Sequence, residues 1–178
     1  MIHLRTGLPS VFLKPGEAYV GEEPTVVTTV LGSCVSITLF SPRLKLGAIC
    51  HTILPSGDSR GSDDQYKYVD QTLRRLLGIF DSYGIRRREI EVKLFGGSNM
   101  LEQPERREGS RSVGEQNVRA ALTAIEEEGL SLVSSDTGGC GGRKILFYTH
   151  TGQVMLRRSR RRTNEPDLCP FPSTGGLR

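Results

Sequence analysis

Three runs rich in β-branched residues constrain the fold of this 178-residue chain more than any other feature. They are "TVVTTVL" at 25–31, "CVSITLF" at 34–40 and "GAICHTIL" at 47–54. Val, Ile and Thr favour pleated strands, so each run predicts a strand. The segment "SPRLKL" separates the last two runs, and its Pro42 suits a turn but not a central ladder. We therefore expect the last two runs to form an antiparallel hairpin.

The expected hairpin carries a cysteine, Cys34, and a histidine, His51. Facing residues of an antiparallel pair have index numbers with a constant sum, and same-face neighbours differ from it by two. An even-length turn centred just after Pro42 or just after Arg43 makes Cys34 and His51 direct or diagonal partners on one face. An odd-length turn without a bulge places them on opposite faces. Because neighbouring strand residues alternate, Cys50 then points away from His51 and into the core.

The remainder of the chain mixes helices with further strands. Apolar residues at helical spacing predict a helix over 66–83 that ends at Gly84, and a second helix that ends at Gly129. The inward positions are Val69, Leu73, Leu76, Leu77 and Phe80 in the first helix, and Val118, Ala121, Leu122 and Ile125 in the second. Short strands are expected at 17–20, 91–95 and 130–134, and a hairpin over 144–156 that turns at Thr151 and Gly152.

These elements predict an α/β protein with antiparallel hairpins rather than a regular alternation of strands and helices. The length suits one domain, which we assign to residues 1–162. The chain is rich in Pro, Gly, Asn and Ser after Arg162, so we expect residues 163–178 to form a disordered tail.

Hydropathy and cysteine usage bear on the compartment and on metal binding. No run approaches the roughly 18 apolar residues of a membrane span, and the N-terminus lacks the pattern of a signal peptide. We therefore place the protein in the cytoplasm, without membrane insertion, and expect its four cysteines to be free thiols. None of them forms a CxxC pair, so a structural zinc site has no local signature.

The net charge of +4 comes from one segment, "LRRSRRR", and without its five arginines (Arg157, Arg158, Arg160, Arg161 and Arg162) the balance is −1. Such a segment can bind nucleic acid or an acidic partner, with a steep dependence on salt. No aromatic residues are interleaved to stack on bases, which favours a solvated segment, and we expect no nucleic-acid binding.

Two interpretations of Cys34 and His51 stay open at this point: a thiol nucleophile with its base, or two ordinary buried strand residues. A neighbouring imidazole promotes formation of the reactive thiolate. Gly32 and Ser33 allow a sharp turn whose backbone N–H groups can hold a developing oxyanion. The weaker alternative base is His150, paired with Cys140 of "GGCGG"; His3 lies in the N-terminal lead-in, where we expect it to be exposed.

The order of several motifs adds a resemblance to a known family. "VVTTVLGSCVSITLF" and "GAICHTILP" are followed by "YKYVDQTLRRLL", "KLFGGSNM", "GEQNVRAA" and "DTGGCGGRKILFYTHTGQVMLRR". Between about Lys14 and Arg158 this series closely resembles the CheD family, the chemoreceptor glutamine deamidases of bacterial chemotaxis. The segment after Arg158 lies outside the resemblance.

The resemblance implies a fold and a set of site residues. The fold is an α/β sandwich with two main helices, similar to cysteine-dependent deamidase toxins. Cys34 corresponds to the nucleophile and His51 to its base, while Gly32 and Ser33 supply backbone support. The family offset of six residues selects Thr28 as the third member of the site, with Thr29 as the alternative if the strand shifts by one. No metal or organic cofactor is implied.

The resemblance also implies a reaction and partners. A cysteine-dependent amidohydrolase would convert receptor glutamine side chains to glutamate through a thioester and release ammonia. Its partners would be methyl-accepting chemoreceptors and a CheC-type phosphatase, and the protein itself would be a monomer. The alternative is a non-catalytic regulatory module that acts by binding such partners. For the loops "GGSNM" and "DTGGCGGR", glycine turns at strand ends are favoured over functional loops that shape receptor docking.

Overall fold

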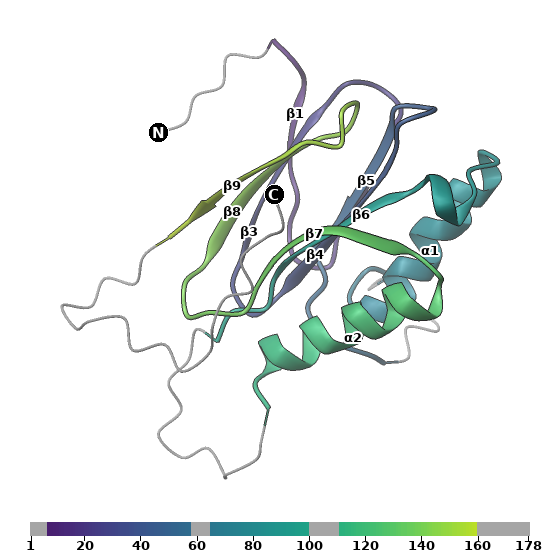
Figure 1. The fold of residues 1–178 in the computed structure, drawn as a ribbon. Helices are drawn as coiled ribbons and strands as arrows, with labels where there is room; N and C mark the ends of the chain where they lie inside the picture. The colour runs from purple at the N-terminus through teal and green to yellow at the C-terminus, as the bar shows by residue number, and fades with distance from the viewer. Residues whose placement is uncertain (1–6, 58–64, 100–110, 160–178) are drawn as a thin grey trace.

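A computed structural model of the chain describes residues 7–57, 65–99 and 111–159. These residues form three layers: a four-stranded sheet, a five-stranded sheet and a pair of helices (Figure 1). The five-stranded sheet lies in the middle, with the helices on one face and the smaller sheet on the other. The expectation of an α/β sandwich with antiparallel hairpins is confirmed.

The five-stranded sheet has the order β2-β5-β4-β6-β7. Its strands are β2 (Ala18–Gly21), β4 (Val35–Ser41), β5 (Leu46–Cys50), β6 (Glu91–Gly96) and β7 (Ser131–Thr137). All pairs are antiparallel except β6 with β7, which run parallel on either side of the helical crossover. Every residue of β4 and β5 is buried because other layers cover both faces, which explains their nearly continuous apolar sequences.

The four-stranded sheet has the order β1-β3-β8-β9. Its strands are β1 (Ser10–Phe12), β3 (Val26–Leu31), β8 (Arg143–Tyr148) and β9 (Val154–Arg158). The hairpin of β8 and β9 turns around Thr151 and Gly152 as expected. The three-residue strand β1 was not predicted, because it is too short to carry an alternating pattern of its own.

The helices α1 (Val69–Ser82) and α2 (Val113–Glu127) cover the outer face of the five-stranded sheet. All five predicted inward positions of α1 are buried. The inward stripe of α2 differs from the prediction, since Leu122 is 44% exposed and Asn117 is fully buried. Ser112 caps α2: its hydroxyl accepts the Glu115 N–H, and the Glu115 carboxylate accepts the Ser112 N–H. Neither described helix combines the length and apolar character that crossing a membrane requires.

The two sheets are in close contact where β5 begins. A Cβ atom at Gly47 would lie 2.4 Å from the Thr149 carbonyl oxygen and 2.8 Å from its Cα. Real Cβ atoms do not come this near to backbone, so only glycine permits the contact. Thr149 itself is tied to the start of β3, where its Oγ1 accepts the Thr25 N–H at 3.0 Å. This contact fixes the distance between the sheets at the end opposite His51.

Substitution of Gly47 by alanine should therefore lower the free energy of unfolding by about 1–3 kcal/mol, because the new methyl group overpacks the interface between the sheets. Gly78, on α1, is the matched control, since a Cβ atom there meets nothing within 4 Å. Gly78→Ala should raise stability by roughly 0.5–1 kcal/mol. Urea unfolding of both variants measures the effect, and a Gly47→Ala protein as stable as the wild type would contradict the described packing.

Candidate active site

The register of the β4–β5 hairpin decides the relation between Cys34 and His51. The numbers of facing residues add up to 87, as in Thr38 with Ile49, so the turn is even and centred after Arg43. The same register continues to an isolated bridge between Val35 and Thr52. The numbers of Cys34 and His51 add up to two less than this sum, so the two residues are diagonal neighbours on one face. The same-face prediction is confirmed.

This shared face points into the space between the two sheets. Cys34 packs against the apolar cluster between the sheets and is partly exposed, whereas His51 is only 3% exposed. Cys50 lies on the opposite face, in the core under the helices, where its Sγ is 3.4 Å from the Ile37 N–H. Burial raises the pKa of Cys50 to about 12. Of these two thiols, Cys34 is therefore the one that a substrate can reach.

A chain of two hydrogen bonds orients His51. The Thr29 hydroxyl donates to the Leu13 carbonyl at 2.8 Å, and the same Oγ1 lies 2.7 Å from His51 Nδ1. A hydroxyl has one proton, and Thr29 gives it to Leu13, so Oγ1 must accept from Nδ1. The Nδ1–H tautomer of His51 follows. The lone pair of Nε2 is then available as a base.

The threonine in contact with His51 is thus Thr29, whereas the family offset selects Thr28. Successive side chains of β3 alternate between the two faces of its sheet. Thr29 is fully buried on the face toward His51. Thr28 lies on the outer face, in register with Phe12 of β1 and Leu146 of β8. The alternative threonine named from the sequence is the one that the fold selects.

The segment Gly32–Ser33–Cys34 is held by its carbonyl groups. The Ser98 N–H donates to the Gly32 carbonyl, and the Gly97 N–H donates to the Cys34 carbonyl, each at 2.8 Å. The Ser33 carbonyl accepts from Asn117 Nδ2 at 3.0 Å. Within the described part of the chain, the N–H groups of Ser33 and Cys34 have no hydrogen-bond acceptor beyond the Cys34 sulfur itself. These two amides are therefore suited to bind an oxyanion beside the thiol.

A buried ion pair between Arg143 and Asp136 supports this segment through Ser98. Arg143 is 2% exposed, and its Nε lies 2.5 Å from Asp136 Oδ1. Its other nitrogens donate to the Gly138 carbonyl and to the Ser98 hydroxyl. The glycine-rich loop is thus a structural element wrapped around Arg143, consistent with the glycine-turn interpretation. A buried guanidinium holds its position through several fixed acceptors, which makes this a rigid support.

The electrostatics of the site favour two neutral groups at neutral pH. Burial raises the pKa of the Cys34 thiol above its ordinary value of 9.0, and the backbone N–H of Cys34 offsets only part of this increase. Burial lowers the pKa of His51 below its ordinary value of 6.5, although the Leu13 carbonyl and the charge of Glu17 act in the opposite direction. The resting site therefore holds a thiol and a neutral imidazole rather than an ion pair.

The other candidate residues do not assemble a site. His150 lies in the turn after β8, whereas Cys140 precedes the start of that strand, so the length of β8 separates them. Cys140 is disulfide-bonded, so the expectation of free thiols is wrong for this residue. His3 and the arginines at 160–162 lie outside the described residues. Arg158 pairs with Asp136 at 2.6 Å.

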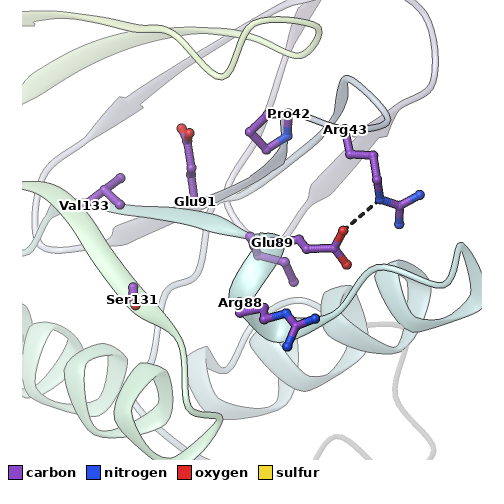
Figure 2. Close-up of a pocket in the computed structure, with 8 residues that line it drawn as sticks. Pro42, Arg43, Arg88, Glu89, Glu91, Ser131 and Val133 are labelled. Carbon is purple, nitrogen blue, oxygen red and sulfur yellow. Dashed lines mark hydrogen bonds and ion pairs between the residues drawn. The ribbon is translucent and has the colours of Figure 1, made fainter.

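A cavity of about 360 Å³ lies at the far end of β4, lined by Pro42, Arg43 and Glu89 among others. Figure 2 shows the Arg43–Glu89 ion pair at its edge, with Arg88 and Glu91 nearby. The cavity is roughly 20 Å from Cys34, since seven strand residues lie between. It contains neither a cysteine nor a histidine, so it offers no nucleophile. Among the described residues, no three His, Cys, Asp or Glu side chains gather as a metal site.

Comparisons with known proteins identify the family of this chain. Residues 53–158 match the family model described as "CheD chemotactic sensory transduction". The chain belongs to the CheD family. The "Probable chemoreceptor glutamine deamidase CheD 2" of Geobacter sulfurreducens is 50% identical over 154 residues, which cover 86% of this chain and 92% of that protein. Two further relatives have the name "Probable chemoreceptor glutamine deamidase CheD". The protein of Maridesulfovibrio salexigens is 46% identical over 83% of this chain and 91% of the relative. The protein of Pseudomonas fluorescens is 36% identical over 85% of this chain and 85% of the relative.

The orientation of His51 generates a test with two adjacent threonines. Thr29→Val keeps the shape of the side chain but removes the acceptor of the Nδ1 proton, so it should slow alkylation of Cys34 by iodoacetamide at pH 7 about tenfold. Thr28→Val, on the outer face, should leave the rate within twofold of the wild type. Mass spectrometry of the modified Cys34 peptide measures both rates. A slower Thr28→Val protein together with an unaffected Thr29→Val protein would reverse the assignment.

Proposed function

We propose that this protein is a cysteine-dependent chemoreceptor glutamine deamidase, in which Cys34 is the nucleophile and His51 the general base and acid. Membership of the CheD family and the names of its relatives support the reaction. The observation that carries the residue assignment is that a partly exposed thiol shares one face of the hairpin, as a diagonal neighbour, with an imidazole whose Nδ1 proton is held by Thr29.

The first half of the reaction forms a thioester. His51 Nε2 takes the Cys34 proton as the sulfur attacks the side-chain carbonyl carbon of a receptor glutamine. A C–S bond forms, and the carbonyl electrons move onto the oxygen of a tetrahedral intermediate. The imidazolium then returns its proton to the nitrogen of the substrate, the C–N bond breaks and ammonia leaves.

The oxyanion of the intermediate would be bound by the amides of Ser33 and Cys34. Their orientation depends on the carbonyl groups of the same segment, which Ser98, Gly97 and Asn117 hold. Because these donors are fixed before the substrate arrives, little reorganisation is needed as the charge develops. Loss of one such donor in other enzymes costs on the order of 100-fold to 1,000-fold in rate.

The second half of the reaction releases glutamate. The neutral His51 removes a proton from water, and the resulting hydroxide attacks the thioester carbonyl. When the second tetrahedral intermediate collapses, the C–S bond breaks and the imidazolium protonates the departing Cys34 sulfur. The site returns to its neutral pair, and every proton has passed through Nε2. The chain's own residues thus complete the cycle.

Several features of the working protein belong to this proposal. The substrate would be a methyl-accepting chemoreceptor, and we place the reaction in the cytoplasm with a monomeric enzyme. A CheC-type phosphatase is the further partner that the family suggests. The family relationship supports these partners, and the geometry of Cys34, His51 and Thr29 supports the chemistry.

The decisive comparison is between Cys34 and Cys50, the two free cysteines among the described residues. A chemoreceptor cytoplasmic fragment incubated with the wild type should gain about one dalton at specific glutamines, the mass change from amide to acid. Cys34→Ala should abolish this gain, because it removes the nucleophile, and His51→Ala should reduce it at least 100-fold. Cys50→Ala should retain it, since Cys50 lies in the core. A Cys34→Ala protein that still deamidates the fragment would refute the mechanism, as would a wild type that never does.

A further inference from the structure

Asn117 on α2 connects the two segments that carry the nucleophile and the base. Its side chain is fully buried. Its Nδ2 donates to the Ser33 carbonyl at 3.0 Å and to the Ile53 carbonyl at 2.8 Å. Ser33 immediately precedes Cys34, and Ile53 follows His51 by two residues. One amide group thus bridges both halves of the candidate active site.

The chemistry of the partners fixes the orientation of this amide. Both partners are backbone carbonyl oxygens, which only accept, so the NH₂ group of Asn117 must face them. Its Oδ1 is buried and has no hydrogen-bond partner among the described residues. An unsatisfied buried acceptor is costly in a native protein and calls for an explanation. The gain from the two donor contacts is the explanation that this structure offers.

The two hydrogen bonds of Asn117 lie where the ladder between β4 and β5 ends. The last backbone pair between the two segments joins Val35 and Thr52 in both directions, at 3.1 and 2.9 Å. Hydrogen-bonded pairs alternate with non-bonded ones along an antiparallel ladder, so the next bonded pair would be Ser33 with Leu54. The Leu54 N–H donates instead to the Lys67 carbonyl, and the Ser33 carbonyl accepts from Asn117. Asn117 supplies the missing cross-link from the side. Without it, the ladder would not restrain the segments that carry Cys34 and the chain after His51.

Helix α2 is itself seated firmly on the site. A Cβ atom at Gly114 would lie 2.5 Å from the Gly97 carbonyl oxygen and 2.7 Å from the Ser98 carbonyl oxygen. The first turn of α2 therefore rests on the loop whose N–H groups hold the Gly32 and Cys34 carbonyls. The position of Asn117 is consequently fixed relative to the segment that it binds.

We propose that Asn117 is a positioning residue that sets the separation between Cys34 Sγ and His51 Nε2 by clamping the Ser33 and Ile53 carbonyls. This inference rests on the proposed function for its effect on turnover. Cys34 and His51 are diagonal neighbours, with Cβ atoms roughly 7 Å apart or somewhat less, so proton transfer depends on how far the two segments converge. A displacement of about 1 Å at a reacting group can cost on the order of 100-fold in rate.

Two substitutions at Asn117 distinguish the effect of its hydrogen bonds to Ser33 and Ile53 from the effect of the volume that its side chain fills. Asn117→Ala removes both donors and leaves a small cavity, and Asn117→Asp keeps the shape but turns a carboxyl group toward two carbonyls. Ser112→Ala is the matched control, because it removes the N-cap of the same helix and leaves the Asn117 contacts in place. Thermal unfolding gives the folded fraction of each variant, to which all rates are normalised.

Two readouts apply to these variants. The first is the steady-state deamidation of a chemoreceptor fragment. The second is the alkylation rate of Cys34 by iodoacetamide as a function of pH, which needs no receptor. In the wild type, imidazole assistance should maintain alkylation at pH values below those at which hydroxide alone ionises the thiol.

We expect both Asn117 variants to lower kcat by about 10-fold to 100-fold with little change in KM, and to lower alkylation near pH 7 by a similar factor. Above the pKa of the thiol their alkylation rates should converge on the wild-type rate, because hydroxide then removes the proton. Ser112→Ala should match the wild type in both assays. This pattern requires a geometric effect on proton transfer.

The inference is overturned if folded Asn117→Ala protein keeps the wild-type alkylation profile and kcat. It is equally overturned if Asn117→Ala and Ser112→Ala lose the same activity in proportion to lost folded protein, since the residue then acts through stability alone. A wild type that does not deamidate the fragment refutes the proposed function instead. The alkylation profile then decides the role of Asn117 by the same criterion.

Discussion

The hydrogen bond between Thr29 Oγ1 and His51 Nδ1 joins the two sheets at the point where chemistry is possible. Thr29 belongs to the four-stranded sheet, and His51 directly follows β5 of the five-stranded sheet. The direction of this bond is set by Leu13, whose carbonyl takes the only proton of the hydroxyl. The tautomer of the base therefore depends on how the sheets pack, which the close contact of Gly47 with Thr149 fixes at the other end. A shift of one sheet over the other would break the Thr29–His51 hydrogen bond and so remove the orientation of the base.

The neutral resting pair has a consequence for the mechanism. Burial raises the pKa of Cys34 and lowers that of His51, so in the proposed mechanism the thiolate is not stored in advance but forms as the sulfur attacks. Transfer of the proton during the attack demands a short and well-aligned path between the two side chains. In our proposal, Asn117 and the Arg143–Asp136 pair next to Ser98 supply that alignment. Rigid packing here compensates for the absence of a preformed ion pair.

The parity of one hairpin was the most productive prediction from sequence. The β-branched runs and a proline predicted the hairpin and reduced the question to the parity of its turn; the structure shows the even turn after Arg43 that places Cys34 and His51 on one face. The family offset counts residues and selects Thr28, whereas the two threonines lie on opposite faces of β3 and the packing between the sheets brings Thr29 to His51. Asn117 gave no signal of its own, since a polar residue in an amphipathic helix predicts a solvated position. Its burial depends on carbonyl groups distant in sequence.

The most direct test of this account is a ¹⁵N NMR titration of the His51 imidazole in the wild-type protein. A buried base with its Nδ1 proton on Thr29 should show the Nδ1–H tautomer at neutral pH, and should become imidazolium only below the ordinary histidine pKa of 6.5. Two results would contradict the central claim that His51 is a neutral base for Cys34. One is imidazolium at neutral pH, which would indicate a stored thiolate partner. The other is a proton on Nε2 instead of Nδ1.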